Sequence, residues 1–375
     1  MQAGIYVEGL PEYTPEQIAS HKSTESRVWV TYKRGVYDIT DFIELHPGGA
    51  SRISLASGAS IDPFWALYAQ HHTNEVYELL EEMRIGNLIE STTHEIVAPD
   101  DPFKNEPRRH PALKVVSLKP FNAETPLQIL CDNFITPNAL FFVRNHLPVP
   151  KVNIDAYRLT IHGLGIDKEI SLTVDEIRSL FKKYSVTATI QCAGNRRNSF
   201  GKIRPVKGLS WSTGAISTAI WSGALLKDVL KFCGVSAQSV ENLDIEHIHF
   251  EGMYYKREII LAYEMNGEPL PVDHGFPLRA IVPGVVGARD VKWLKSIVLS
   301  SDESPSFWQQ HDYRIINETQ AFDSSCLLNG SFSPSIDWST VDWRRAPSIQ
   351  EYPVQSGICY PTDGSQIEKE EDTLH

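Results

Sequence analysis

The chain has 375 residues, of which 42% are apolar and 22% charged, and its formal net charge is −12 at pH 7. This composition is typical of globular domains and excludes disordered, collagen-like and coiled-coil chains. No apolar run approaches the about 18 residues that a membrane-spanning helix needs, and the acidic charge argues against nucleic-acid binding. The length favours two or three domains.

The negative charge is concentrated near the N-terminus. Residues 1–100 hold 6 Lys/Arg and 15 Asp/Glu, a net charge of −9, and the last ten residues carry −3. Residues 101–365 carry 28 charges of each sign and are neutral. An acidic N-terminal module beside a neutral body predicts a basic protein partner for that module.

The five cysteines are an odd and sparse set without a disulfide-like spacing, which favours a reducing compartment or simple thiols. The N-terminal stretch MQAGIYVEGL has neither a signal-peptide pattern nor an Arg/Ser-rich amphipathic one. No targeting presequence is expected from this sequence.

The first 88 residues predict a compact α+β module. Thr14-Pro15-Glu16-Gln17 has the N-cap, proline and N3 residues of a helix start. The alternating, β-rich run Arg27–Tyr32 predicts a strand, with Val36–Thr40 as its neighbour. Short helices are predicted over 41–45, 50–57, 64–70 and 75–83, the last with Asn74 as its N-cap.

Residues 89–107 have few core residues and three prolines, which predicts an inter-domain linker. Beyond it, strand-like runs outnumber helical ones. Strands are predicted over 156–162, 186–191, 259–263 and 278–282, and helices over 173–184 and 225–233. This pattern predicts a second, strand-rich α+β domain that extends to about residue 345.

Two histidines in the first module carry a possible metal site. His46 precedes Pro47-Gly48-Gly49, and His71 follows 25 residues later, after a stretch rich in apolar and aromatic side chains. Two neutral imidazoles that face each other across an apolar cavity can fill both axial positions of a haem iron, which suits electron transfer. Alternatively, His46 is a turn residue and His71 or His72 is a solvated helix-end residue.

The surrounding blocks VWVTY, GVYDITDFIELHPGG, GASIDPFWALYAQHH and EVYELLEEMRIGNL span roughly residues 10–88 and resemble the cytochrome b5 family. The resemblance implies haem b as the cofactor and His46 and His71 as its iron ligands. His72 stays open as an alternative ligand at this point.

The second motif is TIQCAGNRR, in which a β-rich strand ends at Cys192 and two arginines follow a glycine turn. Adjacent positive charge favours a thiolate, which is a soft metal ligand or a nucleophile. The alternative is a buried structural cysteine. Three further loops, 142–148, 273–279 and 286–292, each carry arginine with other polar donors, which together predict a site for an anionic cofactor and a small oxyanion.

Long blocks of the second domain resemble the sulfite oxidase family. They are RHPALKVVSLKPFNAETP, ITPNALFFVRNHLPVP, TIQCAGNRR, GLSWSTGAISTAIWSGALL, LAYEMNGEPLPVDHGFPLRAIVPGVVGARDVKWL and FSPSIDWSTVDW. With the haem module, the resemblance spans most of 10–364. Plant-type nitrate reductases share the molybdenum domain but place their haem module after it, so the N-terminal haem module favours the sulfite oxidase family.

The resemblance implies a molybdenum–molybdopterin cofactor with Cys192 as the molybdenum ligand, and oxidation of sulfite to sulfate by oxygen-atom transfer. Electrons would then leave singly through the haem to cytochrome c. The implied molybdopterin contacts are Phe142, Val143, Arg144, Asn145, His146, His274, Arg279, Asp290, Val291 and Lys292. The implied sulfite pocket is Arg144, Arg197, Trp211 and Tyr313.

The implied architecture is a haem module over 10–88, a linker over 89–107, a molybdopterin domain over 108–345, and the start of an immunoglobulin-like dimerisation domain with an acidic tail over 346–375. This sequence departs from the family pattern by a short segment at 253–260, an insertion at 314–331 and the short C-terminal part. A truncated or mis-spliced gene model, or a divergent isoform, would explain them, and the incomplete last domain argues against the family's homodimer.

The resemblance also implies the mitochondrial intermembrane space as the compartment. Two alternative functions remain at this stage. One is a nitrate-reductase-like molybdenum enzyme, and the other is a haem-only electron-transfer protein whose molybdenum domain is inactive.

Overall fold

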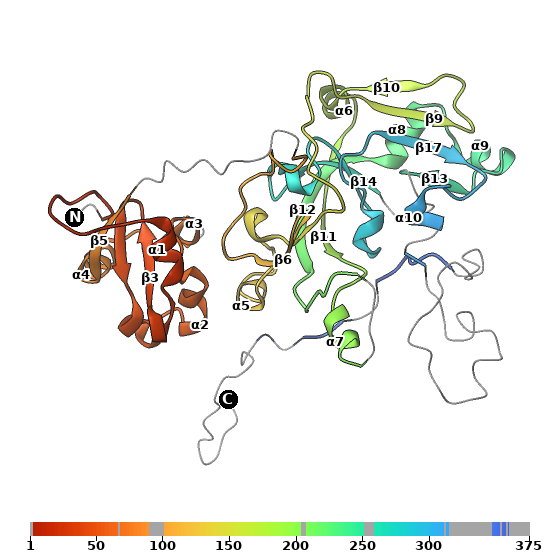
Figure 1. The fold of residues 1–375 in the computed structure, drawn as a ribbon. Helices are drawn as coiled ribbons and strands as arrows, with labels where there is room; N and C mark the ends of the chain where they lie inside the picture. Colours follow the sequence, from red (N-terminus) through yellow and green to blue (C-terminus); the bar gives the residue numbers. More distant parts are fainter. Residues whose placement is uncertain are drawn as a thin grey trace, which may run out of the picture. The chain divides into compact units, whose positions relative to one another are not determined.

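The computed structural model describes residues 3–66, 68–89, 101–203, 208–250, 259–310, 313–314, 347–352, 355–357 and 359. The chain divides into two compact units, Met1–Phe142 with Ser356–His375, and Val143–Gln355. Both contain helices and strands, as the α+β prediction required (Figure 1). Within the described part of the chain, no helix is both long and apolar enough to cross a membrane.

The three departures from the family pattern fall largely outside the described residues. These leave out 251–258, 315–346 and 360–375, and therefore most of the short segment, the insertion and the acidic tail.

A five-stranded sheet with the strand order β1-β5-β4-β3-β2 forms the frame of the first unit. β1 runs parallel to β5, and the other neighbours are antiparallel. The strand predicted over Arg27–Tyr32 is β3 with the same bounds, and its predicted neighbour is β4. The strands are β1 (Glu12–Tyr13), β2 (Lys22–Ser23), β3 (Arg27–Tyr32), β4 (Gly35–Asp38) and β5 (Arg84–Leu88).

Short helices surround this sheet. The predicted start of α1 is confirmed, because the Thr14 side chain accepts from the Gln17 amide and the Gln17 side chain accepts from the Thr14 amide. The helices are α1 (Pro15–Ser20), η1 (Thr24–Ser26), η2 (Thr40–Leu45), α2 (Ala50–Ile53), η3 (Ser54–Ala56), α3 (Asp62–Trp65), η4 (Ala69–His71) and α4 (Asn74–Glu82).

Two helix predictions in this unit are wrong in detail. The helix expected over 64–70 ends at Trp65, and a separate 3-10 turn, η4, carries His71. The N-cap of α4 is Thr73 rather than Asn74, because the Thr73 hydroxyl accepts from the Val76 amide and Asn74 is already the first helical residue.

The first unit also contains residues that follow the predicted linker. β6 (Lys114–Leu118) and β7 (Phe121–Glu124) form an antiparallel hairpin, and α5 (Leu127–Leu130) and η5 (Asn138–Leu140) come after it.

A long antiparallel pair, β11 and β12, is the centre of the second unit (Figure 1). Its register runs from Lys183 opposite Ala224 to Gln191 opposite Ile216, so Cys192 is the first residue beyond the paired end of β11. The sheet has the order β11-β12-β14-β15, with β16 also paired to β14. Its strands are β11 (Lys183–Gln191), β12 (Ile216–Leu225), β14 (Ile260–Met265), β15 (Glu268–Pro269) and β16 (Arg279–Ile281).

A second sheet has the order β10-β9-β17-β13. Its strands are β9 (Leu159–Gly163), β10 (Ile170–Leu172), β13 (His247–His249) and β17 (Ser296–Ser300). The remaining elements of the unit are β8 (Val143–Arg144), α6 (Val174–Leu180), α7 (Arg197–Gly201), α8 (Leu226–Phe232), α9 (Ala237–Asn242), η6 (Val272–His274), η7 (Gly287–Arg289) and α10 (Phe307–Gln310).

The helix predicted over 173–184 extends four residues too far at its C-terminal end, and Thr173 is its N-cap. It ends at Leu180, because Lys183 and Tyr184 already pair with β12 as the first residues of β11. One apolar core joins the two sheets of this unit through buried side chains that include Leu159, Ile161, Leu261 and Ile297. Burial of apolar surface contributes about 25 cal/mol per Å² to the free energy of folding. This core therefore stabilises the sheets whose strands lead into the polar loops.

Candidate functional site

The first unit contains an apolar cavity of about 390 Å³ between two histidines. His46 follows the last residue of η2, and His71 is the last residue of η4. Their imidazole rings are parallel, with an angle of 2° between the planes and 6.2 Å between the centroids. The apolar lining includes Val30, Ile39, Phe64, Leu79, Leu80 and Met83.

The protonation of both rings follows from their backbone contacts. His46 Nδ1 lies 3.3 Å from the Gly49 carbonyl oxygen, and His71 Nδ1 lies 3.1 Å from that of Tyr68. Because a carbonyl oxygen can only accept, each Nδ1 carries a proton, and the neutral form of each ring then has its lone pair on Nε2, as a metal ligand requires. Burial also lowers the pKa of His71, which favours the neutral imidazole.

His72 has a different environment. Its Nε2 lies 3.0 Å from the carbonyl oxygen of Trp65, and its Nδ1 lies 2.8 Å from the hydroxyl of Tyr77. Both ring nitrogens are therefore engaged by the protein. The structure brings His46 and His71 together across the cavity and leaves His72 outside it.

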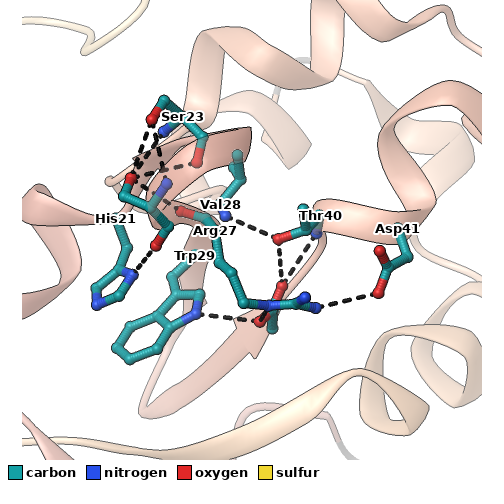
Figure 2. A network of polar contacts seen from close by, with 9 residues as sticks. His21, Ser23, Arg27, Val28, Trp29, Thr40 and Asp41 are labelled. Carbon is teal, nitrogen blue, oxygen red and sulfur yellow. Dashed lines mark hydrogen bonds and ion pairs between the residues drawn. The ribbon is translucent and has the colours of Figure 1, made fainter.

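A polar network fixes the start of η2, the helix that leads to His46. Asp38 Oδ1 accepts from the amide of Thr40 at 3.1 Å and from its hydroxyl at 2.6 Å, while Asp38 Oδ2 accepts from Trp29 Nε1 at 3.2 Å and from Arg27 (Figure 2). Arg27 also pairs with Asp41 at 3.0 Å. Burial opposes ionisation of Asp38, but the hydrogen bonds from Arg27 and Thr40 and the charge of Arg27 outweigh it and lower the pKa of Asp38.

These features fit a haem group. The 6.2 Å between ring centroids leaves room for one iron bound to both rings through bonds of about 2 Å. The apolar walls suit a porphyrin, and the volume lies within the range of small-molecule and cofactor sites.

The second unit carries the Cys192 turn at the end of β11. The Cys192 amide donates to the Ala215 carbonyl oxygen at 2.9 Å, and the Gly194 amide lies 3.4 Å from Cys192 Sγ. Asn195 accepts from the Ala215 amide at 3.1 Å and donates to Gln355 at 3.1 Å. These bonds attach the turn to Ala215 and to Gln355. Cys192 is buried in this turn, with an exposed fraction of 6%.

Two arginines act on this thiol. Burial raises the pKa of Cys192, but the Gly194 amide, the charges of Arg144 and Arg197, and a hydrogen bond from Arg144 oppose that increase. The structure thus brings together a buried thiol and two guanidinium groups from separate loops. This arrangement suits a thiolate metal ligand beside an anion.

The three arginine-bearing loops also meet one another. Lys292 Nζ donates to the carbonyl oxygens of Arg144 and Asp273, at 2.9 and 2.8 Å, and to Asn145 Oδ1 at 2.5 Å. The Asn145 amide donates in turn to Asp273 Oδ1 at 3.1 Å. A Cβ built on Gly287 would lie 3.2 Å from the Gln191 carbonyl oxygen, which places the third loop against the end of β11.

Other predicted cofactor contacts lie deeper. Arg279 and Asp290 are 3% and 2% exposed. Arg279 donates to the carbonyl oxygens of His274 and Asp290, at 2.9 and 2.8 Å, and packs on the ring of Trp221. Burial raises the pKa of Asp290 to about 8, against the opposing charge of Arg279. Through these bonds, Arg279 connects the 273–279 loop to the 286–292 loop in the interior of the second unit.

Three of the predicted molybdopterin contacts have apolar side chains that are partly or fully buried. Phe142 and Val143 are buried, and Val291 packs against the core of the second unit. A contact of these residues with a ligand would therefore involve their backbone groups.

The predicted pocket residue Tyr313 lies beside His146. Its hydroxyl is 3.0 Å from His146 Nε2, and Arg144 donates to His146 Nδ1 at 3.2 Å. Desolvation, with the positive charges of Arg144 and Lys292, lowers the pKa of His146 to about 4. Trp308 packs on the His146 ring at 4.2 Å between centroids. The site therefore contains a neutral imidazole at pH 7.

Buried donors without partners show that the second site fits a polar ligand. Trp211 is fully buried, and the Asn198 amide donates to its carbonyl oxygen at 3.0 Å. Trp211 Nε1 and Gln191 Nε2 are buried and have no hydrogen-bond partner among the residues that the structure describes. Because buried donors are normally satisfied, these atoms fit a ligand with acceptor oxygens or nitrogens, such as a pterin cofactor with an oxyanion.

The sequence did not single out several residues of this site as contacts. Asp273 bonds to the predicted residue Asn145, Trp308 packs on the predicted residue His146, and Gln355 bonds to Asn195 in the Cys192 turn. For Asp273 a signal was available, because it lies in one of the three arginine-bearing loops.

Two known domain families match this chain. Residues 14–89 match the cytochrome b5-like haem/steroid binding domain, and residues 146–308 match the oxidoreductase molybdopterin binding domain. The fold and the two sites therefore define a molybdopterin oxidoreductase with a cytochrome b5-like haem module.

The relatives identify the family. The chain is 49% identical to sulfite oxidase of Gallus gallus over 95% of this chain and 78% of that protein. It is 47% identical to the mitochondrial sulfite oxidase of Homo sapiens over 96% of this chain and 66% of that protein. A nitrate reductase of Hordeum vulgare is 39% identical over 56% of this chain and 26% of that protein. The chain belongs to the sulfite oxidase family.

Proposed function

We propose that this chain oxidises sulfite to sulfate at a molybdopterin-bound molybdenum and passes the electrons through a haem to cytochrome c. The observation that carries the proposal is the buried Cys192 thiol beside the guanidinium groups of Arg144 and Arg197. A soft metal ligand next to two fixed cations suits a metal that reacts with a small dianion. Relatives named sulfite oxidase, matched over nearly the whole of this chain, support the same reaction.

The molybdenum cofactor, when bound, supplies the oxygen-atom transfer of the net reaction SO₃²⁻ + H₂O → SO₄²⁻ + 2H⁺ + 2e⁻. Cys192 would hold the metal as a thiolate. The pterin would be held by Asn145, His146 and Lys292, together with the buried residues His274, Arg279 and Asp290. Asn145 and Lys292 also bind each other, which fixes the two loops that would contact the pterin relative to one another.

The substrate would be bound by charge. Arg144 and Arg197 each present several N–H donors, and such charge-assisted hydrogen bonds bind oxyanions strongly. Trp211, which is fully buried, would exclude water and donate through its unpaired Nε1. Tyr313 would close the pocket through its contact with His146.

The acidic first module suits a basic electron acceptor. Residues 1–100 carry a net charge of −9, and Glu44, Glu75, Glu78 and Glu82 are exposed close in sequence to the two histidines. Acidic side chains around an electron-transfer site steer a basic partner such as cytochrome c. Leu79, an exposed residue that lines the cavity, supplies apolar contact area within this surface.

The same proposal covers the domain division and the compartment. We assign 10–88 to the haem module and 108–345 to the molybdopterin module, which the family matches at 14–89 and 146–308 support. Several relatives are named mitochondrial, which supports a mitochondrial protein, and an acceptor such as cytochrome c supports the intermembrane space.

The test is steady-state reduction of ferricytochrome c by the purified full chain, with molybdenum, iron and haem quantified in the same sample. We expect sulfite-dependent reduction and about one molybdenum and one haem per chain. Nitrate reduction without sulfite oxidation would favour the nitrate-reductase-like alternative. Haem without molybdenum, and no turnover, would favour the haem-only electron carrier.

A further inference from the structure

The guanidinium group of Arg197 lies between two glycines. A Cβ built on Gly194 would lie 2.5 Å from its Nη2 and 2.6 Å from its Cζ, and a Cβ built on Gly208 would lie 2.8 Å from its Nη1. Real Cβ atoms do not approach other heavy atoms so closely. The guanidinium therefore occupies space that a side chain at either position would take.

The two glycines are not equivalent. Gly208 has a φ of +115°, a backbone conformation that L side chains rarely adopt, so glycine is required there by the backbone alone. Gly194 does not have a positive φ of this kind. The three atoms nearest to a Cβ built on Gly194 all belong to the Arg197 guanidinium. This group therefore explains why the position has no side chain.

Arg197 is held in this position by the same turn. Its amide donates to the Gly194 carbonyl oxygen at 3.0 Å, and its Nη1 donates to the Leu209 carbonyl oxygen at 2.9 Å. The Gly194 amide lies 3.4 Å from Cys192 Sγ, so the guanidinium that fills the space at Gly194 is close to this thiol. The guanidinium is therefore folded back over the Cys192 turn instead of extending into solvent.

We propose that Gly194 positions the anion-binding arginine, because its lack of a side chain admits the Arg197 guanidinium to the place beside Cys192 where it binds the anionic substrate. The proposal rests on the proposed function and extends it to a residue that touches neither substrate nor cofactor. Gly194 acts through Arg197 and is thus a positioning residue.

The test compares Gly194→Ala with Gly201→Ala in the cofactor-loaded full chain. A Cβ at Gly201 meets nothing within 4 Å, so that variant is a matched control for a glycine-to-alanine change. A displaced charge-assisted hydrogen bond should raise the KM for sulfite about 10- to 100-fold in Gly194→Ala. The molybdenum and haem contents should stay within about twofold of wild type, because the side chains that would hold the two cofactors are unchanged, and kcat should fall by a smaller factor than KM rises.

A second readout does not depend on turnover. Sulfate, the product dianion, is titrated into the oxidised wild-type and variant proteins by calorimetry. Its dissociation constant should increase in Gly194→Ala by about the same factor as KM and should not change in Gly201→Ala.

A double-mutant cycle separates this role from a structural one. In an Arg197→Ala background, Gly194→Ala should have no further effect on KM or on sulfate binding, because the displaced group is already gone. An equal penalty in both backgrounds, unchanged KM and sulfate affinity in Gly194→Ala, or loss of molybdenum from that variant alone would overturn the proposal. If wild type fails to oxidise sulfite, the proposed function fails instead, and the sulfate titrations still report on Gly194.

Discussion

The imidazole rings of His46 and His71 face each other with parallel planes and a centroid separation of 6.2 Å. Each ring donates its Nδ1 proton to a backbone carbonyl oxygen, so both Nε2 atoms are prepared for one metal ion. A haem iron with both axial positions filled by histidine has no open position for oxygen chemistry and is suited to electron transfer.

The choice between His71 and His72 gives the first prediction. His71→Ala should abolish the low-spin bis-histidine absorption spectrum and reduce the haem content of the purified protein. His72→Ala should retain both, because His72 contacts Tyr77 and Trp65 rather than the cavity. If His72→Ala lost the spectrum and the haem while His71→Ala kept both, His72 rather than His71 would be the ligand opposite His46.

His46→Ala tests the order of electron flow. The variant should keep sulfite oxidation with ferricyanide, an artificial acceptor that reacts directly at the molybdenum site, and should lose most of the cytochrome c reduction. Parallel assays with the two acceptors on one preparation measure the split. Equal loss with both acceptors would indicate that His46 affects the second unit as well.

The Asp38 network predicts an acid-sensitive haem module. Because the pKa of Asp38 is lowered in the folded state, its contribution to stability is present at neutral pH and is lost as the pH falls below the ordinary value of about 3.9. Asp38→Asn should lower the free energy of unfolding at pH 7 by about 1–2 kcal/mol, because bonds to a charged acceptor are weakened.

The matched control for that variant is Asp41→Asn, since the Asp41 side chain is 88% exposed and pairs with Nη2 of Arg27, whereas Asp38 accepts from Nε of Arg27. It should change stability by less than about 0.5 kcal/mol. Urea unfolding followed at the haem absorption band, at pH 7 and at pH 3, measures both effects. If Asp38→Asn were as stable as wild type at pH 7, the network would not anchor η2.

His146 predicts a specific pH dependence at the second site. With a pKa of about 4, the side chain should remain neutral from pH 8 down to pH 5, and its NMR signal should not titrate near 6.5. Since the folded state disfavours the proton, stability should decrease as the pH falls from about 6.5 toward 4, and His146→Gln should remove that part of the decrease. An ordinary titration midpoint near 6.5 would contradict this environment.

Motifs that are continuous in sequence could be predicted well. The strand Arg27–Tyr32, the α1 start at Thr14 and the Cys192 turn each depend on neighbouring residues, and the structure confirms the two elements and shows the turn at the end of β11. The three arginine-bearing loops could be grouped from their composition alone.

Contacts between residues far apart in the chain could not be predicted from the sequence. Asn145 bonds to Asp273 and Lys292, which lie 128 and 147 residues away, and no local pattern encodes those contacts. Tertiary pairing also overrode local propensity at Lys183, where β11 replaces the end of a predicted helix. His71 and His72 are adjacent in sequence and differ only in what the fold places around them.

The most direct test of the account is anaerobic addition of sulfite to the purified, molybdenum-loaded chain while the haem absorption is recorded, without any added acceptor. Wild type should reduce its haem. Cys192→Ser should keep an unchanged oxidised haem spectrum and show no reduction, because the thiolate that holds the metal is gone. Haem reduction by Cys192→Ser at the wild-type rate, or an oxidised haem in wild type that contains molybdenum, would contradict the central claim that Cys192 anchors the centre from which the haem receives its electrons.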